Sequence, residues 1–146
     1  KNKITNISSE HRKMNAALKK IKSHPNAIVV GLVEDTKEWI KNCEFLISPF
    51  SKPHFSRPVL EAFACKKCVI GTDVEGMEEI IDHNVNGLII KKNDPILLAK
   101  AINYLHANPK KSEEYGKNGF LKAFKLFSSK NILQIQEIYE ELSHDI

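Results

Sequence analysis

The sequence lacks the features that mark membrane-spanning, secreted or disordered chains. No apolar run approaches the ~20 residues that a membrane-spanning helix needs, and no signal peptide is recognisable. Cysteine is scarce, with three residues, an odd number. Hydrophobic residues make up 42% and charged residues 27% of the chain, which excludes a disordered composition. We therefore expect a cytoplasmic protein of one ordinary domain with a substantial core.

Motifs for metal binding and covalent catalysis are also missing. Cys65 and Cys68 form a Cys-x-x-Cys pair, but zinc would need a second ligand pair, and a redox pair would stand at the opening of a helix. The acids between Asp73 and Glu79 are compatible with magnesium, yet acids are also common where a helix begins. No Ser-His-Asp or Cys-His arrangement and no Gly-Lys-Ser/Thr phosphate loop can be assembled. We therefore assign no metal site and no certain catalytic residue.

Positive charge is modest and dispersed. The net charge is +4 and the pI is near 8.9, and the lysines include isolated doublets such as Lys66-Lys67 and Lys91-Lys92. No basic run is interleaved with aromatic residues, so we expect no nucleic-acid partner. The charge is compatible with solvated lysines, or with a surface that attracts phosphates or anionic lipid heads.

Short apolar runs alternate with helical patterns along the chain. The candidate strands are residues 4–7, 27–30, 45–47, 68–70 and 88–90. The candidate helices are residues 8–23, a short helix capped by Thr36, a helix from Pro58, a turn or two at 78–81, a helix from Pro95 capped by Asp94, and helices at 112–124 and 128–143. Such alternation indicates right-handed βαβ units. We therefore expect an α/β fold with a doubly wound parallel sheet and extra carboxy-terminal helices.

Ligands in a doubly wound fold bind outside the carboxyl ends of the strands. The β-branched run at 27–30 is typical of a strand buried on both faces. The loops after Val30, Ile47 and Ile70 are therefore expected to share one cleft. Gly31 would let a planar ring approach the backbone there, although a strand-end glycine is about as often a simple turn residue.

The stretch from Ser48 to Ala62 has the pattern of an anion site. A loop with three prolines precedes a helix in which Pro58 suits the first turn and Ser56 suits the N-cap. Backbone N–H groups and the positive end of the helix dipole then meet at the end of a strand. Glu61 lies one turn into the helix, where it can reach a sugar hydroxyl beside a bound phosphate. The alternative is a proline-stiffened loop with an ordinary helix cap.

These loop residues belong to a longer ordered series. The series is Ser48-Pro49, Phe55, Pro58, Leu60 to Ala64, Val69 to Asp73, Gly76, Glu79 and Asn84 to Leu88. Over roughly residues 27–105 it resembles the carboxy-terminal half of the retaining, nucleotide-sugar-dependent glycosyltransferases of group 1. The resemblance implies a GT-B fold of two Rossmann-like domains, in which the carboxy-terminal domain holds a nucleoside-diphosphate sugar without an obligatory metal.

The resemblance also implies how the chain would be used. Residues 1–146 would be the nucleotide-sugar-binding domain of a two-domain enzyme of polysaccharide biosynthesis, inactive alone. A missing amino-terminal domain would bind a glycan or lipid-linked acceptor, and peripheral association with the inner face of the membrane stays open. The helix at 128–143, with Ile132, Ile135, Ile138 and Tyr139, resembles the one that crosses back to that domain.

The family signature pairs two glutamates, and the chain keeps one of them. The second falls on Glu61, which the resemblance implies binds the ribose hydroxyls. The first falls on Pro53, which cannot serve, so His54 or Ser56 would substitute, or the sugar would be held differently. Phe55 has His54 and Ser56 beside it where the family has glycines, so less backbone is accessible to the diphosphate. Arg57 adds a positive charge that partly offsets this loss.

Three further positions follow from the resemblance alone. Leu32 and Val33 would flank the nucleotide base, and Glu79 would stand near the donor-loop helix. Two alternatives remain open. The chain could be a nucleotide or sugar-nucleotide binding module that has lost the chemistry, with Pro53 as the mark of that loss, or part of a GT-B sugar-nucleotide epimerase.

Overall fold

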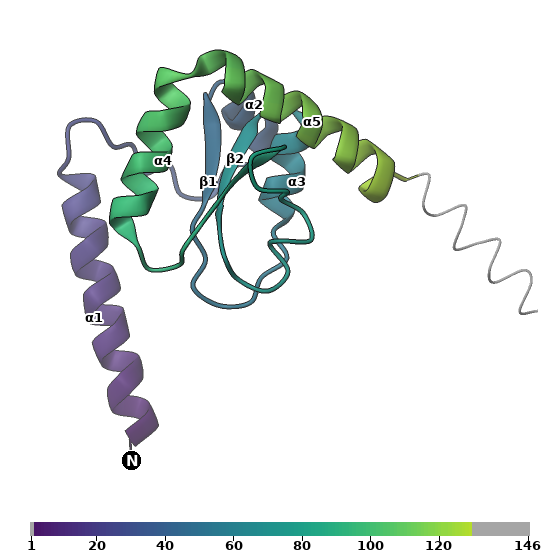
Figure 1. The fold of residues 1–146 in the computed structure, drawn as a ribbon. Helices are drawn as coiled ribbons and strands as arrows, with labels where there is room; N and C mark the ends of the chain where they lie inside the picture. The colour runs from purple at the N-terminus through teal and green to yellow at the C-terminus, as the bar shows by residue number, and fades with distance from the viewer. Residues whose placement is uncertain (1, 130–146) are drawn as a thin grey trace, which may run out of the picture. The chain divides into compact units, whose positions relative to one another are not determined.

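The computed structural model describes residues 2–129, with side chains from residue 11 onward. It divides the chain into two compact units, residues 1–34 and residues 35–146, whose described parts are treated separately below. Figure 1 shows the helices and strands of both units along the chain.

The first unit consists of a long helix and a segment without regular structure. Helix α1 spans Asn2–Lys22, so the predicted strand at 4–7 is wrong and the helix begins six residues before the predicted start at Ser8. The physical reason is that no glycine or proline interrupts residues 2–22, so a helix once nucleated continues through the short apolar run.

The buried strand predicted at 27–30 is also wrong. These residues have no strand assignment, and Ile28 is 82% exposed. A β-strand forms only when its backbone is hydrogen-bonded to a neighbouring strand. The sheet of the described residues contains no segment from this unit. Apolar composition alone therefore did not determine a strand here.

The second unit is built on a three-stranded parallel sheet. Its strands are β1 (Phe45–Ser48), β2 (Cys68–Thr72) and β3 (Gly87–Ile90), in the order β1-β2-β3. Phe45 pairs with Cys68, and Val69 pairs with Gly87. The three strands match the runs predicted at 45–47, 68–70 and 88–90.

Helices cover both faces of this sheet, because successive strand side chains point to opposite sides. On one side Leu46, Val69 and Ile89 pack with α2 (Thr36–Lys41) and α3 (Arg57–Ala64). On the other side Phe45, Cys68, Ile70, Leu88 and Ile90 pack with α4 (Pro95–Ala107) and with Tyr115 of α5 (Pro109–Phe127). The predicted α/β class and doubly wound parallel sheet are therefore confirmed.

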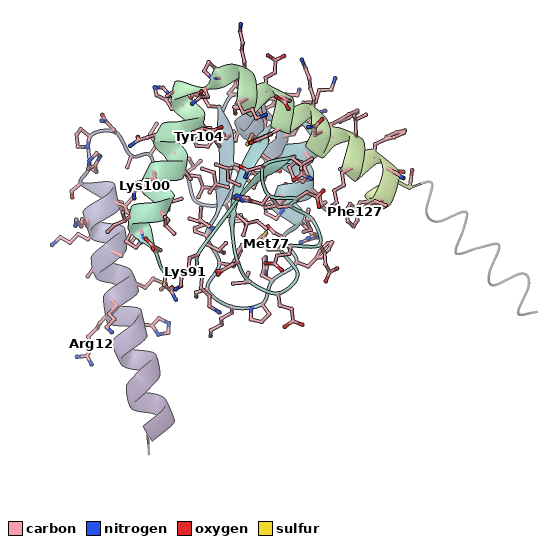
Figure 2. The ribbon with its side chains drawn as sticks, viewed as in Figure 1. Arg12, Met77, Lys91, Lys100, Tyr104 and Phe127 are labelled. Carbon is pink, nitrogen blue, oxygen red and sulfur yellow. The ribbon has the colours of Figure 1, made fainter. Side chains whose placement is uncertain are left out.

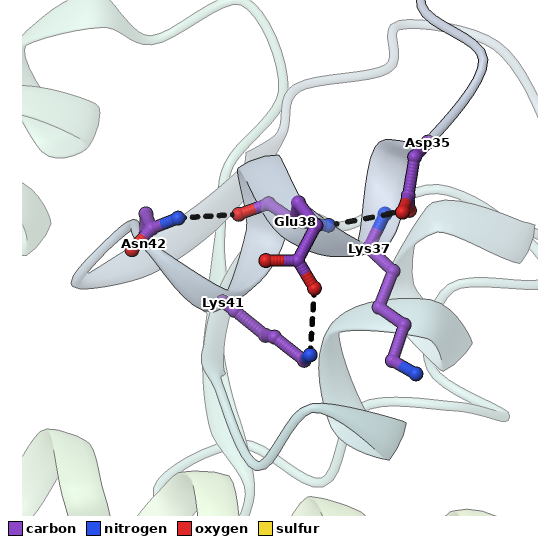
Figure 3. Close-up of polar contacts among 5 residues, drawn as sticks. All are labelled: Asp35, Lys37, Glu38, Lys41 and Asn42. Carbon is purple, nitrogen blue, oxygen red and sulfur yellow. Dashed lines mark hydrogen bonds and ion pairs between the residues drawn. The ribbon is translucent and has the colours of Figure 1, made fainter.

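The observed starts of the helices agree in part with the starts predicted from the sequence. Asp94 caps α4 and Pro95 is its first residue, as predicted. The cap of α2 is Asp35, not Thr36, since the Asp35 carboxylate accepts hydrogen bonds from the N–H groups of Lys37 and Glu38 (Figure 3). Helix α5 begins at Pro109, earlier than predicted, because proline suits the first turn of a helix.

Successive turns, not a helix, follow β2. Residues 75–80 are turns, and Met77, labelled in Figure 2, is fully buried among them with Ile80 and Ile81. The N–H groups of Ile80 and Ile81 both reach the Met77 carbonyl, so one turn closes without continuing. The predicted helical turn at 78–81 is corrected accordingly. A turn is present at 84–86, whereas Gly87, predicted to belong to it, is the first residue of β3.

Helix α5 packs closely over the end of α3. A Cβ atom at Gly116 would lie 2.1 Å from the Lys66 carbonyl oxygen, and one at Gly119 would lie 2.2 Å from the Phe63 ring. Glycine at these two positions lets α5 approach the Lys66 backbone and the Phe63 ring this closely. These two positions fix where α5 crosses the sheet.

Among the described residues, no helix is both long enough and apolar enough to cross a membrane. The predicted helix at 128–143 lies, from residue 130 onward, outside the described residues, and so do Ile132, Ile135, Ile138 and Tyr139.

Candidate functional site

The loops after β1 and β2 meet at the carboxyl edge of the sheet. The Thr72 hydroxyl donates a hydrogen bond to the Phe50 carbonyl at 2.6 Å, and the His54 N–H donates to the Glu75 carbonyl at 2.8 Å. Gly76 has φ +88° and lies against the His54 backbone, where a Cβ atom would be 3.1 Å from the carbonyl. The structure thus brings together two of the three loops expected to share a cleft.

The third of those loops, with Leu32 and Val33, lies in the first unit. Leu32 is fully exposed and Val33 is half-buried.

The loop after β1 is closed by a buried pair of hydroxyl groups. The Ser48 and Ser56 side-chain oxygens lie 3.1 Å apart, and both residues are buried. Ser56 holds the N-cap position of α3, as predicted, but its side chain makes no capping hydrogen bond. Because the Ser56 hydroxyl points toward Ser48, it makes no hydrogen bond to the backbone N–H groups in the first turn of α3.

Aromatic rings stiffen the same loop. The rings of Phe50 and His54 stack with centroids 3.7 Å apart and an interplanar angle of 24°. Phe55 is 44% exposed and meets Phe127 of α5 edge-on, with centroids 5.8 Å apart. These ring contacts join residues within the loop and join the loop to α5.

The charged residues of α3 are exposed at its first two turns. Arg57 and Pro58 are the first two residues of the helix, so the proline stands in the first turn as predicted. Glu61 is exposed one turn further on, and its Oε2 accepts a hydrogen bond from the Thr36 hydroxyl at 3.3 Å. A positive helix end with one nearby carboxylate can hold a phosphate and a hydroxyl group together.

Glu79 is exposed in the turns after β2. Among the side chains that the structure describes, those of residues 11–129, no group of three or more His, Cys, Asp or Glu is placed to hold a metal ion. Cys68 is buried, and burial raises the pKa of its thiol to about 12, so this group stays protonated at neutral pH.

Cavities lie at both ends of the strands in the described part of the chain. A cavity of about 310 Å³ at the carboxyl edge is lined by residues that include Pro49, Thr72, Lys91 and Asn93. A cavity of about 410 Å³ is lined by residues that include Glu44, Lys67 and His106, which come just before β1, just before β2 and at the end of α4.

The sequence analysis gave no site role to two residues of this edge. Thr36 contacts Glu61 from 25 positions away, and Thr72 joins the two loops through the Phe50 carbonyl. Thr72 could have been found from its place at the end of a predicted strand. Thr36 carried no such signal, because the packing of α2 on α3 is a property of the folded chain.

The family model for glycosyl transferases group 1 matches residues 8–122. Uncharacterized glycosyltransferase MJ1178 of Methanocaldococcus jannaschii is 31% identical over 129 residues, covering 88% of this chain and 37% of that protein. Capsular polysaccharide biosynthesis glycosyltransferase CapM of Staphylococcus aureus is 29% identical over 119 residues, covering 82% of this chain and 30% of that protein. The chain thus spans little more than a third of these relatives at most.

Solved structures have the same fold. Sucrose-phosphate synthase from Thermosynechococcus elongatus superposes with a TM-score of 0.82 at 25% identity, over 94% of this chain and 35% of that one. Anabaena HepE in complex with UDP-glucose superposes with a TM-score of 0.76 at 22% identity, over 98% of this chain and 38% of that one. The fold, the ordered loop residues and the matching family model agree, and the chain belongs to the group 1 glycosyl transferases.

Proposed function

We propose that the chain is the donor-binding domain of a two-domain glycosyltransferase that transfers a sugar, with retention of configuration, from a nucleoside diphosphate to a glycan or a lipid-linked acceptor. The observation that carries the proposal is the meeting of the β1–α3 loop with the turns after β2, at the edge where α3 begins. The complex of Anabaena HepE with UDP-glucose supports a nucleotide sugar as the donor.

The diphosphate would lie at the start of α3. The helix dipole and Arg57 supply positive charge there, and the Ser56 hydroxyl is turned away toward Ser48. Negative charge grows on the diphosphate as the sugar leaves, so charge held in place at this point lowers the barrier to transfer. No metal is required for this role.

The other residues predicted for the donor site would contact the remaining parts of the donor. Glu61 would accept hydrogen bonds from the ribose hydroxyls, and Leu32 and Val33 would flank the base. His54, Phe55 and Pro58 would shape the wall beside the diphosphate and sugar. Glu79 would stand near the same edge from the turns after β2.

The acceptor would bind through an amino-terminal domain that this chain does not include. A lipid-linked acceptor would bring the enzyme to the inner face of the membrane, where a net charge of +4 favours contact with anionic lipid heads. A glycan acceptor would leave it in the cytoplasm.

Titration of nucleoside diphosphates tests the donor site. Glu61→Gln removes the charge that strengthens hydrogen bonds from ribose hydroxyls, which should weaken binding by about 1–3 kcal/mol. Arg57→Ala removes a contact with the diphosphate, and its effect should shrink as salt rises, because screening already weakens an exposed ion pair. Calorimetry at low and high salt on the wild type and both variants measures the two effects.

Inorganic pyrophosphate is the control ligand, because it lacks ribose. The Glu61→Gln loss should be smaller for pyrophosphate than for a ribonucleotide, whereas the Arg57→Ala loss should persist. Equal losses for both ligands, or no nucleotide binding by the wild type at millimolar concentration, would favour a module that keeps the fold without the chemistry. Pro53 at the position of the first signature glutamate favours that second function.

A further inference from the structure

One contact links α2 to the proposed donor site. The Thr36 hydroxyl, at the first residue of α2, donates a hydrogen bond to Glu61 Oε2 on α3 at 3.3 Å. We propose that Thr36 is a positioning residue that holds the Glu61 carboxylate for the two ribose hydroxyls of a nucleoside diphosphate. This inference rests on the proposed function, and it makes Thr36 a determinant of selectivity for ribonucleotides.

The start of α2 holds Thr36 in place. The Asp35 carboxylate accepts hydrogen bonds from the N–H groups of Lys37 at 3.0 Å and Glu38 at 3.4 Å (Figure 3). Thr36 lies between these residues in the chain, so the same bonds fix the turn that carries it. These bonds satisfy helix donors that would otherwise lack partners. The first turn of α2 is therefore set before any ligand binds.

The other end of this short helix is tied as well. The Asn42 side chain donates to the Glu38 carbonyl at 2.8 Å, and Lys41 pairs with Glu38 at 2.7 Å (Figure 3). A helix of six residues is marginal alone, so contacts at both ends matter for its persistence. Ile40 is buried in one cluster with Val59 and Phe63 of α3, which sets the position of α2 relative to Glu61.

The geometry leaves Glu61 room for a ligand. A carboxylate has about four acceptor sites on its two oxygens. The Thr36 hydroxyl takes one of them on Oε2, so Oε1 and the second site on Oε2 can accept two neighbouring hydroxyl groups. A cis-diol such as that of ribose presents two such donors side by side.

Holding the carboxylate in advance improves binding through preorganisation. A free glutamate side chain loses rotamer freedom when a ligand orders it, and this cost reduces affinity. With Thr36 bonded to Oε2, part of that order exists before the ligand arrives. Loss of the hydroxyl should therefore weaken recognition of the ribose and leave recognition of the diphosphate unchanged.

The test compares three ligands across matched variants. Uridine diphosphate, 2′-deoxyuridine diphosphate and inorganic pyrophosphate are titrated into the wild type, Thr36→Val, Thr36→Ser and Glu61→Gln. Valine keeps the branched shape of threonine without the hydroxyl, whereas serine keeps the hydroxyl. Thr36→Val should weaken uridine diphosphate binding about threefold to tenfold and lower the preference for the ribonucleotide over its 2′-deoxy form. Pyrophosphate binding by Thr36→Val should stay unchanged. Thr36→Ser should keep the wild-type preference for the ribonucleotide.

The outcomes separate this inference from the function on which it rests. If the wild type binds no uridine diphosphate, or Glu61→Gln has no effect, the proposed donor site fails and this inference with it. If Glu61→Gln weakens the ribonucleotide while Thr36→Val leaves the ribo-to-deoxy preference unchanged, the inference is overturned and the donor site stands. Equal weakening of all three ligands by Thr36→Val would assign Thr36 a purely structural role, and this too would overturn it.

Two further variants keep the test decisive. Thr36→Ala also removes the hydroxyl, and it replaces the valine variant if that one does not fold. In a Glu61→Gln background, Thr36→Val should have little further effect on the ribo-to-deoxy preference, because the two residues act through one contact. Independent, additive losses would contradict the proposed contact.

Discussion

The Cys68 thiol shows how burial of a single residue links pH to stability. The folded pKa is raised by burial to about 12 from an ordinary value of 9.0, so the folded state holds this proton more tightly than the unfolded chain does. The contribution of Cys68 to stability is therefore complete below about pH 9 and is lost as pH rises toward 12. We predict that the free energy of unfolding falls across this window.

Cys68→Ala is the control for that prediction, since alanine cannot ionise. The variant should be less stable at neutral pH, because a buried sulfur is removed, but the stability difference from the wild type should narrow above pH 9. Urea titrations at several pH values measure both curves. If the difference in the free energy of unfolding between the wild type and Cys68→Ala stayed constant from pH 7 to pH 11, folding would not raise the pKa of the Cys68 thiol.

Single-residue roles could be predicted where a residue is defined by its neighbours in the chain. Ser56 and Pro58 were placed at the start of a helix because caps and first turns have local sequence preferences. The Ser48–Ser56 hydroxyl pair and the Thr36–Glu61 contact were not predicted. Both depend on how a strand, a loop and two helices pack, and one sequence does not specify such distances.

Among the elements, α5 depends on two glycines for its position. Gly116→Ala would bring a Cβ atom against the Lys66 carbonyl, part of a backbone that cannot turn aside. We predict a loss of about 1–3 kcal/mol of stability, because overpacking outweighs the better helix propensity of alanine. Thermal unfolding measures it, with Lys110→Ala on the exposed side of α5 as control. A Gly116→Ala variant as stable as the wild type would show that α5 is free to shift.

Helices and strands were predictable where an apolar pattern was bounded by residues typical of turns or helix caps. The three strands of the sheet are short apolar runs bounded by turns or helix caps, and α4 has Asp94 and Pro95 at its start. Residues 27–30 show the limit, since an apolar run becomes a strand only with a partner strand beside it. The turns after β2 show another, because Met77, Ile80 and Ile81 suit a core whether or not a helix forms.

At the scale of the whole molecule, we predict that the chain alone transfers no sugar. The acceptor site is proposed to lie in a domain that this chain does not include, and the chain spans 37% of MJ1178 and 30% of CapM. Assays with radiolabelled nucleotide sugars and glycan or lipid-linked acceptors should show no product. Transfer by residues 1–146 would show that the acceptor site is within this chain.

The bond between the His54 N–H and the Glu75 carbonyl, with Gly76 against the same backbone, has a consequence for how this site can be re-engineered. The hydrogen bond and the close approach join the two loops at that point, so an insertion or deletion in either loop would shift the other. A loop taken from another glycosyl transferase to replace residues 49–56 would therefore keep its shape only if residues 73–81 were transplanted with it. If this edge binds the donor as proposed, both segments would have to be exchanged together to change the donor preference.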